Sequence, residues 1–280
     1  MSALAEPAAA DRRLGLTTGL CLLGAVAGLA LLGPLVVAND PNAQDLVRIL
    51  EAPSFAHPLG TDHVGRDVLA RLVHGAARSL SLGLVSVALA TGAGTALGLL
   101  AAHSGRLADS LLMRLADLLL AFPGMLLALV IAGFLGGGVL PLLVGITLSI
   151  VPQFMRMARA VALGVLVESH VEAARLAGFS TRRILVRHVL PPVWRQIATL
   201  ATLGLGSTIM SISVLGFLGL GLQPPTPEWG ATISEMLPYL SEGPIQLAAP
   251  CLAIFASVLG ATLVGQALSE QPATSAGEAR

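Results

Sequence analysis

The 280-residue chain contains no lysine: all sixteen basic residues are arginine, and sixteen acidic residues balance them. Charged residues make up 11% of the chain and aromatic residues 4%, whereas 55% of the residues are hydrophobic. Because soluble domains carry about 25% charged residues, this composition excludes an ordinary soluble enzyme. The neutral balance also excludes nucleic acid as a default partner, since phosphate binding needs a surplus of basic residues.

Cysteine is scarce as well. Cys21 and Cys251 each stand alone in an apolar run, which excludes a disulfide framework and a Cys-x-x-Cys site. Without lysine the chain cannot form a Gly-x-x-x-x-Gly-Lys-Ser/Thr phosphate loop, so any ATP chemistry must belong to a partner. No apolar run offers paired catalytic groups or a metal-binding His-Glu-x-x-His, and we therefore expect no catalytic residue and no metal site in this chain.

Long runs without any charged residue are what the sequence has instead. They span residues 14–39, 79–105, 118–155, 196–227 and 243–269. A membrane-spanning helix needs about 20 apolar residues. The third run is too long for one helix and contains Gly136-Gly137-Gly138, so we divide it into spans at 115–135 and 139–157. The sequence therefore predicts an all-α membrane protein with six transmembrane helices.

The arginines orient these spans, because cytoplasmic loops are enriched in basic residues. With six spans and a cytoplasmic N-terminus, twelve arginines lie inside, and Arg48, Arg66, Arg71 and Arg78 lie outside. A five-span arrangement with the N-terminus outside gives the same division, and both place the loop 156–195 in the cytoplasm. The predicted organisation is a cytoplasmic tail (1–14), a first transmembrane helix (15–38), an external segment (39–78), a five-helix core (79–270) and a cytoplasmic tail (271–280).

The loop 156–195 holds seven of the sixteen arginines. Ser169 and Glu172 have the spacing of a capping box, which predicts a short Ala-rich helix that Gly178 can end. Ser180 then predicts the cap of a second helix, 181–190. Pro191 and Pro192 are expected to stop that helix. On local chemistry alone, the segment is either a well-capped connector or a small-residue helix that fits closely into a partner's groove.

The same loop has a spaced motif of Glu172-Ala173-Ala174, then Gly178, then Leu190-Pro191. It resembles the EAA loop of binding-protein-dependent ABC transporter permeases. His188 stands where the family often has Ile, and this departure resembles the DppC/OppC-like branch of dipeptide, oligopeptide and nickel importers. Further segments that resemble this branch span residues 57–72, 114–123 and 213–230. The resemblance covers roughly residues 55–270, although 264–270 lacks the Gly-Asp and Arg-Asp pairs usual there.

The resemblance implies a MetI-like permease fold in which the loop forms a coupling helix seated in a groove of an ATPase. The implied coupling residues are Glu172, Ala173, Ala174, Arg175 and Gly178. Implied partners are a second homologous permease, one or two P-loop ATPase subunits that use ATP and Mg, and an external solute-binding protein. The implied location is a bacterial or archaeal inner membrane. Short peptides are the expected substrate, with nickel or a metal–metallophore complex as the alternative.

The predicted external side carries two further motifs. Glu228-Trp229-Gly230 follows a Pro-rich turn, and Trp229 is either an anchor at the membrane surface or, with its neighbours, part of a docking site for the binding protein. Asp62 and Asp67 lie close together in sequence. We favour a pair of turns with Asp caps over a metal loop, because the ligand spacing of an EF-hand is absent.

A self-contained membrane protein is the competing class. No charged side chain lies at the centre of a predicted span, which argues against a proton-driven transporter. A sodium site made of backbone carbonyls would leave no such signal, and a secondary transporter therefore stays open as an alternative.

Overall fold

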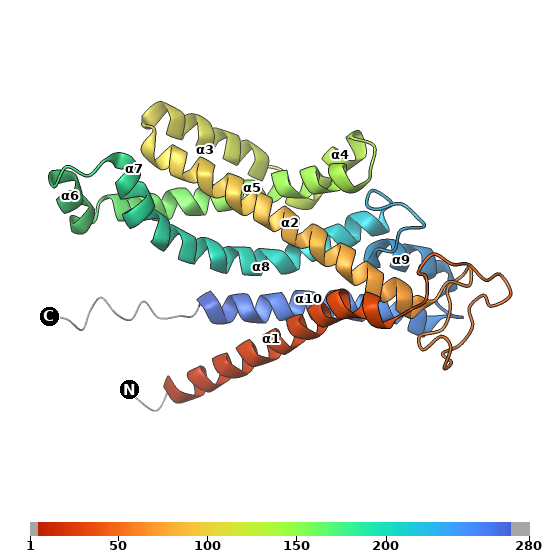
Figure 1. Ribbon diagram of the computed structural model, residues 1–280. Coiled ribbons are helices and arrows are strands. Elements are labelled where there is room, and N and C mark those ends of the chain that lie inside the picture. The colour runs from red at the N-terminus through yellow and green to blue at the C-terminus, as the bar shows by residue number, and fades with distance from the viewer. Residues whose placement is uncertain (1–4, 270–280) are drawn as a thin grey trace.

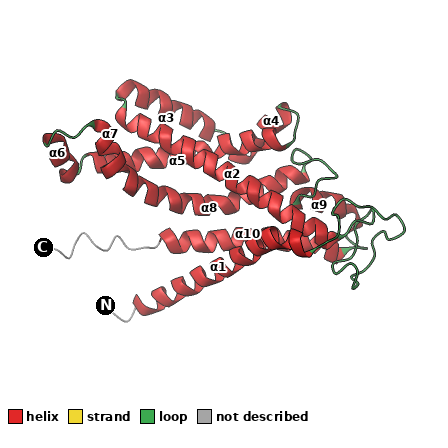
Figure 2. Cartoon of the chain, viewed as in Figure 1, coloured by secondary structure: helices red, strands yellow, loops and turns green. Residues whose placement is uncertain are grey.

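The computed structural model describes residues 5–269, and every regular element in that range is a helix (Figures 1 and 2). In chain order the elements are α1 Ala5–Val36, α2 Val68–His103, α3 Arg106–Leu120, α4 Gly124–Phe134, α5 Val139–Leu166, α6 Ser169–Leu176, α7 Thr181–Ile184, a π-helical segment Leu185–Val189, α8 Leu190–Phe217, α9 Trp229–Met236, a 3-10 turn Leu237–Tyr239 and α10 Pro244–Ser269. The predicted tail 271–280 lies outside the described residues. The all-α fold is confirmed.

Among the described residues, five helices are long and apolar enough to cross a membrane: Arg12–Val36, Val68–His103, Val139–Leu166, Thr181–Phe217 and Pro244–Ser269. The span predicted at 115–135 is a broken pair instead, since α3 and α4 meet at an 87° bend. Pro123 stands at this break, where its ring and missing N–H end the preceding helix. Counting the bent pair as one span gives the predicted six.

The helix that contains the second predicted span begins before the charge-free run 79–105. α2 begins at Val68, inside the segment predicted as external, because Asp67 caps it by accepting a hydrogen bond from the backbone N–H of Ala70 (2.7 Å). A search for charge-free runs misses these first turns because they carry Arg71 and Arg78.

The helices form an elongated bundle with two distinct ends (Figure 1). α6 and α7 lie at one end, where α1 also begins and α10 finishes; we call this the α6 end. The connection 37–67 and α9 lie at the opposite end, which we call the α9 end. This arrangement agrees with a common side for both termini and the loop 156–195.

Small residues let the central helices approach closely. Gly94 and Gly98 of α2 face α5, and a Cβ at Gly98 would lie 2.8 Å from the Cβ of Ala158. This small-xxx-small spacing is typical of helix packing in lipid. At the edge of the bundle, Arg159 of α5 forms an ion pair with Asp109 that holds α3 (Nη2–Oδ2 2.6 Å).

Candidate functional site

The short helix α6 is attached to the bundle by one narrow face. Val171 is fully buried and Ala174 is 7% exposed. Both belong to a core cluster with Val165 at the end of α5 and with Ile184 and Val189 beyond the turn. The spacing of three residues between Val171 and Ala174 gives a single buried stripe, and the rest of the helix faces outward.

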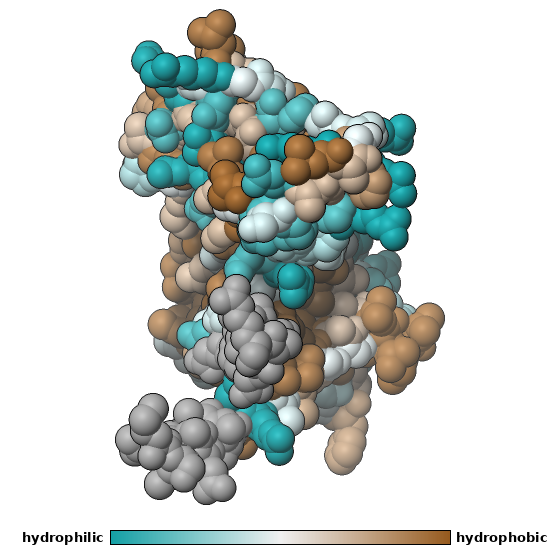
Figure 3. Space-filling model, turned by 90° about the vertical axis from the view of Figure 1, so that its left-hand side faces the viewer, coloured by the Kyte–Doolittle hydropathy of each residue, from teal (hydrophilic) through white to brown (hydrophobic). Residues whose placement is uncertain are grey.

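The outward face carries most of the predicted coupling residues. Glu172, Ala173, Arg175 and Gly178 are exposed, and only Ala174 is buried. Leu176 is 85% exposed, and this residue was missed by the sequence analysis. The sequence carried no signal for it, because an apolar leucine in a short helix is expected to be buried, and only the structure shows that Val171 and Ala174 form the buried face instead. Seen from the α6 end, hydrophilic side chains gather on the upper part of the surface, with apolar side chains among them (Figure 3).

Gly178 ends α6 as predicted. Its φ is +78°, a left-handed conformation that favours glycine. The N–H of Gly178 donates to the carbonyl of Arg175 (2.9 Å), and the N–H of Phe179 donates to that of Ala174 (3.1 Å). A Cβ at Gly178 would meet no atom within 4 Å, so a substitution there strains the backbone without a steric clash.

The predicted capping box is wrong. Glu168 occupies the N-cap position of α6, no side chain caps the helix there, and the Glu168 carboxylate lies 3.1 Å from His170 Nδ1 instead. Ser180 holds the N-cap position of α7, again without a side-chain cap bond. Within residues 5–269, the exposed carboxylate of Glu172 makes neither an ion pair nor a side-chain hydrogen bond, which leaves it available to a partner.

The prediction that Pro191 and Pro192 stop the second helix is also wrong. The chain passes from α7 through the π-helical segment into α8 without interruption. Pro191 and Pro192 stand in the first turn of α8, directly after the π-helical segment, and neither can donate an N–H to the carbonyls of that segment. Arg183 lies over the Phe179 ring (4.3 Å to its centroid), and this contact holds the turn after α6 against α7.

At the α9 end, Glu228 caps α9 from a fully buried position. Its Oε1 accepts hydrogen bonds from the N–H of Gly230 (3.0 Å) and from the Ser79 hydroxyl (3.1 Å), and its Oε2 accepts one from the N–H of Ala231 (2.9 Å). Burial raises the pKa of this carboxyl group, while these hydrogen bonds act in the opposite direction.

Trp229 is not an anchor at the membrane surface, because its side chain is fully buried. The indole N–H donates to the carbonyl of Leu72 (3.0 Å), and the ring lies against Gly75 of α2. Gly230 is buried too, against the backbone of Ser213 in α8. The Glu228–Gly230 segment thus fastens α9 to α2 and α8. Its predicted role in docking stays a prediction, and it presents no exposed side chain for that purpose.

Buried ion pairs fasten the other end of α9. Arg66 binds both Asp62 (2.6 Å) and Glu235 (2.7 Å), and Arg71 of α2 also binds Glu235 (2.8 Å). Ligand atoms of Asp62, His63 and Glu235 lie within 4.8 Å of one another. Two guanidinium groups already neutralise these carboxylates and oppose a cation there. Asp62 and Asp67 act as turn and cap residues, as the sequence analysis favoured.

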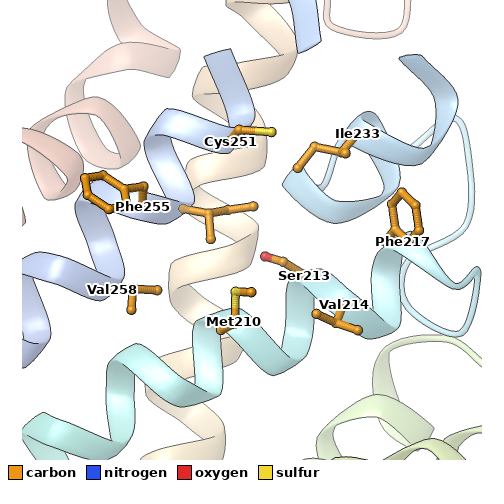
Figure 4. A pocket seen from close by; sticks show the side chains of 9 residues that line it. Met210, Ser213, Val214, Phe217, Ile233, Cys251, Phe255 and Val258 are labelled. Carbon is orange, nitrogen blue, oxygen red and sulfur yellow. The ribbon is translucent and has the colours of Figure 1, made fainter. Parts of the chain in front are cut away.

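An open apolar groove of about 440 Å³ lies between α8, α9 and α10. Met210 and Phe217 of α8 line one side of it, and Cys251 and Phe255 of α10 line the other (Figure 4). No charged residue lines the groove, so it lacks the groups that would bind a peptide's charged termini.

The fold and its outward-facing α6 define a membrane-embedded transport component. Residues 94–270 match the family described as "Binding-protein-dependent transport system inner membrane component", and the chain belongs to this family. It is a transmembrane permease subunit of an ABC importer, of the DppC/OppC-like type. This decides against a self-contained secondary transporter.

Curated relatives sharpen the assignment. The chain is 39% identical to the di/tripeptide transport system permease protein DppC of Pseudomonas aeruginosa over 91% of this chain and 86% of that protein. It is 36% identical to the dipeptide permease DppC of Alkalihalophilus pseudofirmus (90% and 83% covered). It is 38% identical to the glutathione permease GsiD of Pectobacterium atrosepticum (84% and 78% covered).

The fold also matches a solved structure, the inward-facing MetNI methionine ABC transporter. The TM-score is 0.53 at 18% identity, and the match covers 70% of this chain and 95% of that one. At this identity the likeness concerns the fold alone, and it confirms the MetI-like architecture.

Proposed function

We propose that this permease forms half of a translocation path for short peptides, which an external binding protein delivers. The names of its relatives support this substrate class, since two are dipeptide or di/tripeptide permeases and the third transports glutathione. In this proposal the binding protein, rather than the permease, selects the substrate.

The energy for transport comes from a separate ATPase that binds ATP and Mg and contacts α6. The observation that carries this proposal is the outward face of α6: Glu172, Ala173, Arg175 and Leu176 project from a helix held by only two buried residues. Closure of the ATPases would move α6 and, through the continuous helix 181–217, the bundle. ATP and the loaded binding protein each shift the bundle between its inward-facing and outward-facing states only to the extent that they bind the two states with different affinity.

A second homologous permease completes the path, with one or two kinds of ATPase subunit. The twelve-to-four division of the arginines supports placing the α6 end in the cytoplasm and the α9 end outside, in a bacterial or archaeal inner membrane.

A substitution at Gly178 tests the coupling. Gly178→Leu should lower ATP-driven dipeptide uptake roughly 5- to 150-fold, the range of coupling free energies of 1–3 kcal/mol, because it disturbs the turn that sets the direction of α6. Uptake into proteoliposomes that contain the complete importer measures this, and nickel uptake is followed in parallel to test the substrate class.

Gly136→Leu is the matched control. Gly136 also has a positive φ (+91°) and no atom within 4 Å of a built Cβ, but it lies in the link between α4 and α5 at the other end. Equal uptake by both variants, with equal amounts of assembled importer, would contradict the coupling role.

A further inference from the structure

The connection 37–67 at the α9 end has no regular helix, but specific hydrogen bonds hold its conformation. The Thr61 hydroxyl accepts a hydrogen bond from the N–H of Glu51 (2.8 Å) and donates one to the carbonyl of Arg48. From α10, Gln246 Nε2 donates to the carbonyl of Glu51 (3.2 Å). Asn39 donates to the Asp67 carboxylate (3.0 Å), which ties the beginning of the connection to α2.

This fixed segment nevertheless displays large apolar side chains. Phe55 is fully exposed (109%), Val47 is 93% exposed and Leu46 is 69% exposed. Asp45, Arg48 and Glu51 are interspersed with them, which places the segment in water rather than in hydrocarbon. Apolar side chains held exposed on a pre-formed aqueous surface suit contact with a partner, because little ordering remains to be paid for when the partner arrives.

A polar pocket of about 330 Å³ opens in the same connection, and Asp45 and Arg48, the sequence neighbours of Leu46 and Val47, are among the residues that line it. Three aspartates line it, Asp40, Asp45 and Asp67, against a single arginine, Arg48. The Asp67 carboxylate already contacts His57 Nδ1 (2.7 Å) and accepts the capping hydrogen bond from the N–H of Ala70. The Asp45 carboxylate is paired with Arg48 (3.5 Å). The Asp40 carboxylate accepts one local backbone bond from Asn42, so the pocket retains a negative charge that suits a basic side chain.

We propose that Leu46, Val47 and Phe55, together with the pocket at Asp40 and Asp45, form the docking platform for the external solute-binding protein. The occupant has an apolar patch that covers Val47 and Phe55 and an arginine or lysine that enters the pocket. This inference rests on the proposed function, in which such a protein delivers the substrate. It replaces the buried Glu228–Gly230 segment as the direct contact surface.

The location favours a soluble occupant. The connection projects past α9 from the end of the bundle, in line with its long axis (Figure 1). A second permease or the lipid bilayer lies alongside the spans, whereas a soluble protein approaches from the end and meets this connection first.

The test uses the complete importer in nanodiscs and its purified, peptide-loaded binding protein. Val47→Ser/Phe55→Ser should raise the Kd for the binding protein by about tenfold or more, as expected when central apolar contacts are lost. It should also reduce stimulation of ATPase activity at a fixed, subsaturating binding-protein concentration. Asp40→Asn should slow association and weaken its salt dependence, because the charge acts mainly on the encounter rate.

Leu35→Ser is the matched control, because Leu35 is also a highly exposed apolar side chain (81%) but lies on α1 within the predicted first span. An unchanged Kd for Val47→Ser/Phe55→Ser, in an importer whose wild type responds to the binding protein, overturns the platform and leaves the proposed function intact. Loss of the second permease from the purified variant also overturns it, in favour of a permease–permease contact. A wild-type importer that no binding protein stimulates refutes the proposed function itself.

Discussion

Two eight-residue helices, α6 and α9, lie at opposite ends of the bundle, and each has a glutamate in or beside its first turn. In α6 the N-cap residue Glu168 and the first-turn residue Glu172 are both exposed, and only Val171 and Ala174 are buried. In α9 the N-cap residue, Glu228, is fully buried, as is Trp229. Similar residue types therefore serve opposite purposes, since α6 presents its polar groups outward and α9 uses them to attach itself.

α6 and α9 thus illustrate two kinds of segment: one that presents side chains to a partner protein, and one that supports the segment beside it. α6 depends on a thin contact and keeps Glu172 and Leu176 free for another protein. α9 is fixed at both ends, by Glu228 to Ser79 and by Glu235 to Arg66 and Arg71. A segment fixed in this way supports the neighbouring connection 37–67 and leaves partner contact to that connection's exposed side chains.

Among these predictions, we expect substitution of Arg71, which holds α9 through Glu235, to cause the largest loss of stability. Its side chain is 1% exposed, and Arg71→Ala leaves Glu235 and Asp62 with only Arg66. Loss of one partner from a buried ion pair costs about 3–5 kcal/mol. We expect a large fall in the thermal midpoint of the purified importer. Arg71→Lys, which keeps the charge, should show an intermediate fall even where Arg71→Ala yields no folded complex.

Arg48→Ala is the control for this prediction. Arg48 is 52% exposed and pairs with Asp45 at 3.5 Å, an arrangement that contributes only about 0–1 kcal/mol. Equal midpoints for the Arg71 and Arg48 variants would show that the buried network does not hold α9.

The same substitution, alanine to aspartate, at two neighbouring positions of α6 tests how the helix is attached to the bundle. Ala174→Asp places a carboxylate against Val171 and the core cluster, which should cost roughly 2 kcal/mol or more and release α6. Ala173→Asp leaves the fold intact, because its side chain faces outward, but should weaken binding of the ATPase. Limited trypsin cleavage after Arg175 in the isolated permease reports release of α6. Pull-down of the ATPase reports the contact.

Only Ala174→Asp should accelerate cleavage, whereas both variants should lose ATPase. Faster cleavage of Ala173→Asp would mean that the outward face also holds the helix. Full ATPase binding by Ala173→Asp would remove Ala173 from the contact.

The sequence predicted the spans well, because the cost of placing charge in hydrocarbon leaves long charge-free runs. It did not show that the helix of the second span extends back to Val68, since Arg71 is neutralised by Glu235, a residue 164 positions away. It could not foresee the burial of Trp229, which depends on Gly75 and the Leu72 carbonyl of another helix. Local signals predicted Gly178 correctly because its turn involves only neighbouring residues.

Glu228→Gln should cause the smallest loss of stability, and it tests whether Glu228 holds α9 as a charged or as a neutral group. The amide oxygen still accepts two hydrogen bonds, but the NH₂ group faces the N–H of Ala231, a mismatch that costs about 1 kcal/mol, as for a lost helix cap. Burial holds the pKa of Glu228 above its ordinary value, so the wild-type residue binds a proton more readily in the folded state. Its contribution to stability is full below the ordinary pKa of glutamate and is lost as the pH rises through the raised value.

Glu228→Gln should therefore flatten the decline of the thermal midpoint with rising pH while lowering the midpoint itself at acidic pH. Glu242→Gln makes the same change at an exposed position at the same end and serves as the matched control. A wild-type midpoint that rises with pH over this range, and that Glu228→Gln abolishes, would show that the hydrogen bonds from Gly230, Ala231 and Ser79 outweigh burial. Glu228 would then hold α9 as a carboxylate that its hydrogen bonds stabilise, rather than as one that burial destabilises.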